Sequence, residues 1–285
     1  MKPYKTPFYL LLFVFLMVSC SELKELADAQ KPTISVDDFR ISGLSLQDIE
    51  LTFDLQIDNP NPVAVTLSSY DYDLQIENSS FVKGSQPLNT TIPSKGRNNV
   101  SVPVIFTFKE LYNTFTSINS KNEGAYAFIA NVQINVPVLG LIEVPIEKNG
   151  TFPVVKAPTI SVANFSLKDI SFTKADIEVE LNVANPNTFG LILNQLDYGV
   201  DIDGLSTISG EIIDRIEIGG NESQTFKIPA SFSFADLGLA AYNALTSDDP
   251  FEYNLTGSAN IGATLPFFES SSFNFDKTGV VDILR

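Results

Sequence analysis

The sequence predicts an all-β protein built from two tandem antiparallel β-sandwiches, each with one short α-helix. Three observations lead to this prediction. A long stretch of sequence recurs after 126 residues, apolar and polar residues alternate with a period of two in both copies, and proline and glycine, 16 of each, divide the chain into short segments. Alternation of this kind places one face of a strand in a core and the other face in water, as in packed antiparallel sheets.

The repeat defines the expected domain boundaries. Residues 32–36 read PTISV, and residues 158–162 read the same; at this offset about 80 residues align without a gap. A period this long exceeds the 20–50 residues of a solenoid repeat and matches a whole domain. We therefore expect one sandwich at residues 32–155 and a second at residues 156–285.

Several strands are predicted from the alternation. Apolar residues stand at positions 51, 53, 55 and 57 of the first copy and at 177, 179, 181 and 183 of the second. Further strands are expected at 70–76, 99–106, 125–136 and 142–146, with 196–202 matching the first of these in the second copy. Asp203-Gly204 is a favourable pair for a hairpin turn.

One helix per copy is predicted after the strand that ends near residue 106. In the first copy the apolar face of this helix consists of Phe108, Leu111, Phe115 and Ile118. In the second copy it consists of Leu237, Ala241, Ala244 and Leu245, with Ser233 or Asp236 as the N-cap. This face either closes the sandwich or covers an apolar groove, and the sequence leaves both possibilities open.

Composition excludes several classes of function. With 44% hydrophobic residues and a mean hydropathy of +0.11 the chain is expected to fold, and its net charge of −16 argues against nucleic acid as a partner. There is no histidine and only one cysteine, so the common nucleophile–base pairs and transition-metal sites are missing. We expect no enzyme activity, no cofactor and no metal. Three carboxylate pairs (Asp71/Asp73, Asp201/Asp203 and Asp248/Asp249) are expected to be solvated rather than to bind Ca²⁺.

The first 31 residues predict export and lipid attachment. Lys2 and Lys5 precede an apolar run at residues 8–18, which is too short to span a bilayer and typical of a signal peptide over residues 1–19. The run ends at Cys20 in a pattern that resembles the lipobox of bacterial lipoproteins, although Met17 stands where leucine is usual. The alternative is a fortuitous cysteine behind an ordinary signal peptide.

A lipidated Cys20 would place the protein in the cell envelope. Acyl chains such as palmitate on Cys20 would make the membrane a partner, and residues 20–31 would form the lipidated terminus and tether. Ser21 rather than aspartate follows the cysteine, which favours the outer membrane, with the sandwiches facing the periplasm or the cell exterior.

A known family accounts for the core of both copies. Residues 48–62, DIELTFDLQIDNPNP, and residues 175–187 resemble the late embryogenesis abundant type 2 proteins, whose unit is the WHy (water stress and hypersensitive response) domain. The resemblance implies a seven-stranded sandwich of fibronectin-III-like shape with one helix, and an association with desiccation and stress tolerance. The second copy departs from the family pattern. Thr188 replaces a proline, and residues 277–279 come three positions later than the offset predicts, so its last hairpin should be longer.

Two sets of residues are candidates for a specific role. The first is the family turn motif, which we expect to turn the chain rather than to face a ligand: Asn59, Pro60 and Asn61 in one copy, and Asn185, Pro186 and Asn187 in the other. The second is the apolar tip of the last hairpin, with Leu139 and Leu141 in one copy and Phe267 and Phe268 in the other. Turn tips are normally polar, so these tips either pack on a core edge or contact a lipid or protein.

Together these observations predict a non-enzymatic envelope lipoprotein with tandem domains. It would protect against stress and desiccation, or maintain the envelope, by binding exposed surfaces of client proteins or lipids, while its acidic surface prevents self-association. The alternatives are a binding module for lipid or another apolar ligand, and a scaffold or adaptor of an envelope complex.

Overall fold

The computed structural model describes residues 30–137, 139–202, 206–237 and 250–284. They form two compact units. Of the described residues, one unit contains those up to Ser42, Glu50–Phe106 and those of Glu123–Pro153, and the other contains Gly43–Ile49, Thr107–Asn122 and those from Val154 onward. The strands are arranged as two consecutive all-β sandwiches, which confirms the predicted fold class.

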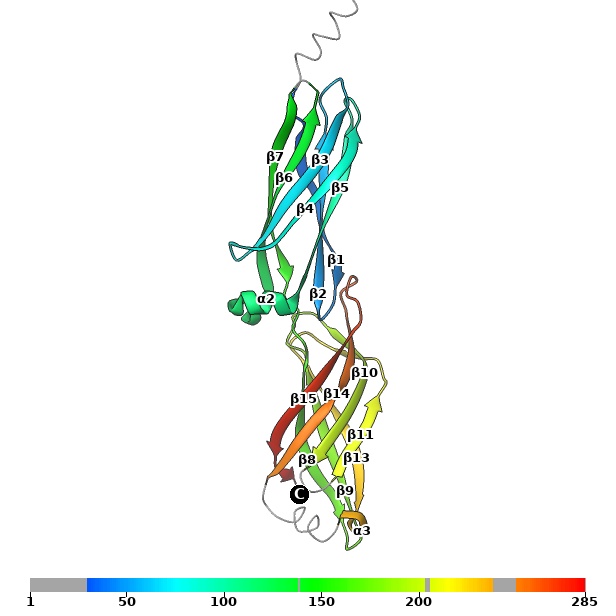
Figure 1. Ribbon diagram of the computed structural model, residues 1–285. Helices are drawn as coiled ribbons and strands as arrows, with labels where there is room; N and C mark the ends of the chain where they lie inside the picture. The colour runs from blue at the N-terminus through cyan, green and yellow to red at the C-terminus, as the bar shows by residue number, and fades with distance from the viewer. Residues whose placement is uncertain (1–29, 138, 203–205, 238–249, 285) are drawn as a thin grey trace, which may run out of the picture. The chain divides into compact units, whose positions relative to one another are not determined.

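The first sandwich has seven strands in two sheets (Figure 1). The three-stranded sheet has the order β1-β2-β5, with β1 at Thr33–Leu44, β2 at Asp48–Asp58 and β5 at Arg97–Thr107. The four-stranded sheet has the order β4-β3-β6-β7, with β3 at Val65–Ile76, β4 at Ser79–Ile92, β6 at Glu123–Val136 and β7 at Gly140–Pro153. Neighbouring strands of the four-stranded sheet pair antiparallel.

The second sandwich repeats this plan with small additions. One sheet has the order β13-β9-β8-β16, with β8 at Thr159–Ile170, β9 at Lys174–Ala184, β13 at Ser223–Ser233 and a short parallel β16 at Ile283–Leu284. The other has the order β11-β10-β14-β15, with β10 at Leu191–Ile202, β11 at Ser206–Ile212, β14 at Phe251–Ala263 and β15 at Ser271–Val281. A short β12, Ile216–Ile218, also pairs with β10. β1, β2, β3 and β5 all recur with both ends shifted by 126 residues.

The predicted alternation places side chains in the cores. The four apolar positions predicted in β2 and the four predicted in β9 are all buried, at 4% exposure or less. In the first core the ring of Phe53 stacks on Phe128, with their centroids 3.9 Å apart. Thr52 is the exception to the pattern, because it is only 3% exposed; its Oγ1 atom lies 2.7 Å from the Oγ atom of Ser42, so its hydroxyl is satisfied.

The helix of the first copy is shorter than predicted. α2 spans Phe108–Thr114, and a 3₁₀ helix, η1, follows at Thr116–Ser120. Phe115 is the C-cap of α2, and Ile118 belongs to η1. The N-terminus of α2 is fixed by a capping box, in which the side chains of Thr107 and Glu110 each accept from the other's backbone N–H.

The helix of the second copy begins where the repeat predicts. α3 is described over Phe234–Leu237, 126 residues after the start of α2. Ala241, Ala244 and Leu245 of its predicted face lie outside the described residues, as does the predicted turn at Asp203-Gly204.

The last hairpin is longer in the second copy, as predicted. Val136 pairs with Gly140 at the tip of the first copy, whereas the corresponding pairing in the second copy ends at Ile261 and Ser271. Tyr126 pairs with Gly150 and Tyr253 pairs with Gly279, so the offset between copies has grown to 127 residues on one strand and 129 on the other.

Four cross-strand pairs place a tyrosine ring over a glycine. In each pair the missing Cβ leaves room for the ring, which covers the backbone in the manner of an aromatic packed over a strand glycine. The pairs are Tyr72 with Gly84, Tyr126 with Gly150, Tyr198 with Gly210, and Tyr253 with Gly279.

We expect Gly150→Ala to lower the free energy of unfolding by about 2 kcal/mol, because the buried ring cannot move freely. A Cβ atom at this position would lie 2.6 Å from the Tyr126 hydroxyl, and that ring is 4.9 Å from Phe39 and 5.6 Å from Phe53. Urea denaturation followed by circular dichroism measures the change.

Gly199→Ala is the control for this substitution. Gly199 also lies within a strand, but the atom nearest to an added Cβ is Thr256 Oγ1 at 3.4 Å, an ordinary contact distance. We expect the control to shift the stability by less than about 0.5 kcal/mol. Equal effects of the two alanines would contradict the proposed role of the tyrosine–glycine pairs.

Candidate functional site

Asn59 is a buried side chain that joins two loops of the first sandwich. It follows β2 and is 2% exposed. Its Nδ2 atom donates to the carbonyl oxygens of Val63 at 2.8 Å and Pro93 at 2.9 Å. Its Oδ1 atom accepts from the backbone N and the Nδ2 of Asn61, both at 3.0 Å. The side chain therefore holds the β2–β3 turn against the loop between β4 and β5.

Asn61 holds the chain that enters the sandwich. Its Nδ2 donates to the carbonyl oxygen of Gln30 at 2.9 Å, and the backbone N of Gln30 donates back to its Oδ1 at 2.7 Å. Its own carbonyl accepts from the backbone N of Lys95 at 2.8 Å. We call this network around Asn59 and Asn61 the asparagine lock.

The second copy contains the same lock. Asn185 Nδ2 donates to Phe189 and Gly219, Asn187 exchanges two hydrogen bonds with Lys156, and Asn221 N donates to the Asn187 carbonyl. Each of these residues lies 126 positions after its counterpart. Because protein groups take up both amide hydrogens of each asparagine, this geometry favours the structural reading of the motif.

A cavity of about 510 Å³ borders the lock in the first sandwich. Three basic side chains and one acidic side chain line it: Lys31, Lys95, Arg97 and Asp58. Arg97 Nε donates to the Asp58 carboxylate, and this hydrogen bond holds the pKa of Asp58 below its usual value. Lys95 Nζ donates to the Pro60 carbonyl at 2.5 Å.

The basic residues of this cavity were missed by the sequence analysis. At the positions equivalent to Lys31, Lys95 and Arg97 the second copy has Ala157, Asn221 and Ser223. A comparison of charge between the two copies, rather than a search for shared motifs, would have found the difference.

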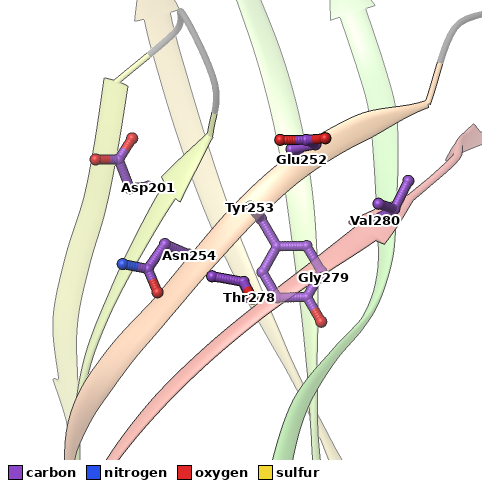
Figure 2. A pocket seen from close by; sticks show the side chains of 7 residues that line it. All are labelled: Asp201, Glu252, Tyr253, Asn254, Thr278, Gly279 and Val280. Atoms are coloured by element: carbon purple, nitrogen blue, oxygen red, sulfur yellow. The ribbon is translucent and has the colours of Figure 1, made fainter.

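A second cavity, of about 390 Å³, lies on the second sandwich (Figure 2). Asp201, Asn254 and Thr278 are cross-strand neighbours there, and the Oδ1 atom of Asn254 is buried without a hydrogen-bond partner among the described residues. Figure 2 shows the ring of Tyr253 beside Gly279.

The carboxylate pairs do not gather into a metal site in the part of the chain that the structure describes. There, no three side chains of a type that binds metals lie together. Asp73 instead accepts from Ser80 Oγ at 2.8 Å, and its neighbour Asp71 is exposed. Asp203, Asp248 and Asp249 lie outside the described residues.

The two apolar hairpin tips differ. Leu139 and Leu141 of the first copy are 44% and 60% exposed. Phe267 and Phe268 of the second copy are half-buried, and the ring of Phe268 lies 6.4 Å from that of Phe189. The first tip thus offers apolar surface to solvent, whereas the second tip is partly covered.

Three of the four residues of the predicted helix face are buried. Phe108 is 2% exposed, and Leu111 and Ile118 are fully buried, whereas Phe115 is half-buried. Most of this face is therefore covered by protein.

Cys20 and the predicted signal peptide lie outside the described residues. Within residues 30–284, apart from the gaps given above, no helix has the length and apolar character needed to cross a membrane.

We expect Asn59→Ala to lower the free energy of unfolding by about 3 kcal/mol. The substitution leaves the Val63 and Pro93 carbonyls without their donor and the Asn61 amide without its acceptor, all in a buried place. Asn59→Asp keeps the shape but directs a carboxylate oxygen at the carbonyls. The aspartate should therefore have a raised pKa in the folded protein, so this variant should regain stability as the pH falls through that pKa and lose it as the pH rises.

Asn149→Ala is the matched control, because Asn149 is exposed and its Nδ2 reaches only Glu147 Oε1. Its effect should stay below about 0.5 kcal/mol. Urea melts between pH 4 and pH 8 compare the variants. A stability of Asn59→Asp that does not depend on pH would contradict the buried donor role of Nδ2.

A comparison with protein families finds the same two-copy organisation. The family model of the late embryogenesis abundant proteins, LEA_2, matches residues 54–150 and 180–279. The late embryogenesis abundant protein Lea14-A of Gossypium hirsutum is 20% identical over 137 residues, which cover 48% of this chain and 89% of that protein. The solution structure of AT1g01470 from Arabidopsis thaliana is similar with 19% identity and a TM-score of 0.38, over 44% of this chain and 83% of that chain.

The two matched segments together span more than half of the sequence and follow the two sandwiches in order. The chain therefore belongs to the late embryogenesis abundant (LEA_2) family and carries the domain of that family twice.

Proposed function

We propose that this protein is a lipid-anchored LEA_2 protein of the bacterial cell envelope that protects client proteins during water stress. LEA_2 domains associate the chain with stress and desiccation. The observation that carries the proposed mechanism is the solvent-exposed tip of the first sandwich, where Leu139 and Leu141 offer apolar surface on an otherwise acidic chain. Such a tip can contact apolar surface that a client exposes when water is withdrawn.

The charge of the chain supports this mechanism. A net charge of −16 makes the molecules repel one another, so an exposed apolar tip can be carried without self-association. Both sandwiches bury most of their large apolar residues in folded cores, so protection would come from a folded surface rather than from a flexible polar chain.

The proposal includes no catalytic step and no cofactor. The chain has no histidine, and its only cysteine is Cys20, which the proposed lipid attachment would consume. A binding module with an apolar groove under the helix is less well supported, since Phe108, Leu111 and Ile118 are buried.

We predict that the double variant Leu139→Asp/Leu141→Asp protects clients less well while its stability changes by less than about 0.5 kcal/mol. The assay dries lactate dehydrogenase with the purified protein and measures the enzyme activity that remains after rehydration. Ile105→Asp is the control, because Ile105 belongs to the same sandwich and is 60% exposed, as Leu141 is. Equal loss of protection by the control and the double variant would remove the tip from the mechanism.

We also predict that Cys20→Ala abolishes the attachment of acyl chains and releases the protein from the membrane fraction. The reason is that the thiol of Cys20 is the only one in the chain that could carry a lipid. Mass spectrometry of the N-terminal peptide and fractionation of cells measure the two effects. If the Cys20→Ala variant stayed in the membrane fraction, the proposed lipid anchor would be contradicted.

A further inference from the structure

We propose that the cavity beside the asparagine lock of the first sandwich is a binding site for a phosphate group. We call it the lysine cavity, after Lys31 and Lys95, the two lysines among its lining residues. The inference goes beyond protection of client proteins and does not depend on the hairpin tip.

The asparagine lock fixes the backbone at or next to both Lys31 and Lys95. Asn61 holds Gln30 through two hydrogen bonds, and Lys31 is the next residue. The backbone carbonyl of Asn61 also accepts a hydrogen bond from the backbone N–H of Lys95. The two lysines therefore belong to segments that one buried residue, Asn61, holds through its side chain and through its backbone carbonyl. A ligand bound by both lysines would not have to order the loops that carry them.

The charge of the lysine cavity matches a phosphate. Arg97 is paired with Asp58, so these two groups offset one another. The positive charges of Lys31 and Lys95 remain, one on each ammonium group, and together they nearly neutralise a phosphate monoester, whose charge is about −1.5 to −2. Lysine binds phosphate as a compact charge, and a volume of about 510 Å³ leaves room for an attached group such as a glycerol.

Lys95 has a backbone conformation that lysine rarely adopts. Its φ angle is +51°, in the left-handed region where asparagine is favoured. The second copy has Asn221 at the same place, with a φ of +59°, and makes the same backbone hydrogen bond. The backbone at this position therefore does not need a lysine, and a lysine kept in an unfavourable conformation points to a role of its side chain. Its Nζ donates to the Pro60 carbonyl at 2.5 Å, and an ammonium group has three N–H donors in all.

The acidic remainder of the chain does not prevent this binding. At physiological ionic strength charges are screened beyond about 8 Å. Asp58, the one carboxylate among the lining residues of the cavity, is already paired with Arg97. The site would thus act locally on a chain that repels anions at long range.

The phosphate group could belong to a lipid headgroup or to a free phosphate ester. Lys31 ends the predicted tether, so the proposed anchor at Cys20 would keep the cavity within roughly 40 Å of the bilayer. Only the choice of the lipid as source rests on that anchor; the phosphate chemistry does not.

The test uses the mature chain prepared without its lipid. Isothermal titration with inorganic phosphate and with glycerol 3-phosphate measures the soluble ligands, and co-sedimentation with phosphatidylcholine vesicles, with and without phosphatidylglycerol, measures the lipid. Lys31→Ala/Lys95→Asn removes the two charges and places at position 95 the residue that the second copy uses. Lys83→Ala/Lys148→Ala removes the same charge from exposed positions on β4 and β7.

We expect the Lys31/Lys95 variant to bind about tenfold more weakly or worse, and the Lys83/Lys148 variant to bind as the unmodified chain does. Binding to phosphatidylglycerol vesicles would identify the source as lipid, and binding to the soluble ligands alone would identify a free phosphate ester. The proposal is overturned if the unmodified chain binds neither kind of ligand at millimolar concentration, or if both variants lose affinity equally. The client-protection assay with the Leu139/Leu141 variant is independent of all these outcomes.

Discussion

In each sandwich, the hydrogen bonds of one buried asparagine amide hold together the loops at the end where the chain enters the first strand. Asn59 and Asn185 are 2% exposed. Each donates to one carbonyl oxygen in the turn that follows its own strand and to another in a loop more than 30 residues later. In a region of low dielectric such bonds are strong when satisfied, and a missing partner is costly. The contact with the incoming chain depends on these hydrogen bonds. Asn59 and Asn185 each accept a hydrogen bond from the side-chain amide of the asparagine two residues later, and that amide then holds the chain that enters the sandwich.

The sequence could predict the strands whose pattern is uninterrupted, and not those in which the pattern changes phase. Apolar residues alternate through most of β2 and β9, so the eight positions predicted there are all buried, and the buried Thr52 is the residue that departs from the alternation. In β1 the apolar positions run through Ile34 and Val36 and then shift to Phe39 and Ile41; the equivalent strand β8 has a register shift between Val162 and Asn164. A β-bulge of this kind breaks the period of two on which the prediction relies.

The helix and the asparagine lock also show where local sequence patterns stop being informative. Leu111 and Ile118 fit one helical period, yet Phe115 ends α2 and a 3₁₀ turn carries Ile118 into its buried place. A tighter turn can satisfy an apolar spacing that suggests a longer helix. The lock motif was visible in the sequence, but its partners Gln30 and Pro93 lie 31 and 34 residues from the asparagines that they meet. Contacts at that separation depend on how the sheets pack, which local patterns do not report.

A tandem pair of domains also separates what the fold requires from what it leaves free. Where the copies share a residue and its bonds, as at Asn59 and Asn185, the simplest cause is the architecture common to both. At Lys95 and Asn221 the copies differ in the side chain. Both residues have a left-handed backbone, and the backbone N–H of each donates to the carbonyl of the equivalent asparagine. Asparagine meets the backbone requirement better than lysine does. The side chain of Lys95 is therefore the part of this position that the two copies do not share. Its ammonium group donates to the Pro60 carbonyl, and Lys95, like Lys31 and Arg97, is among the residues that line one cavity.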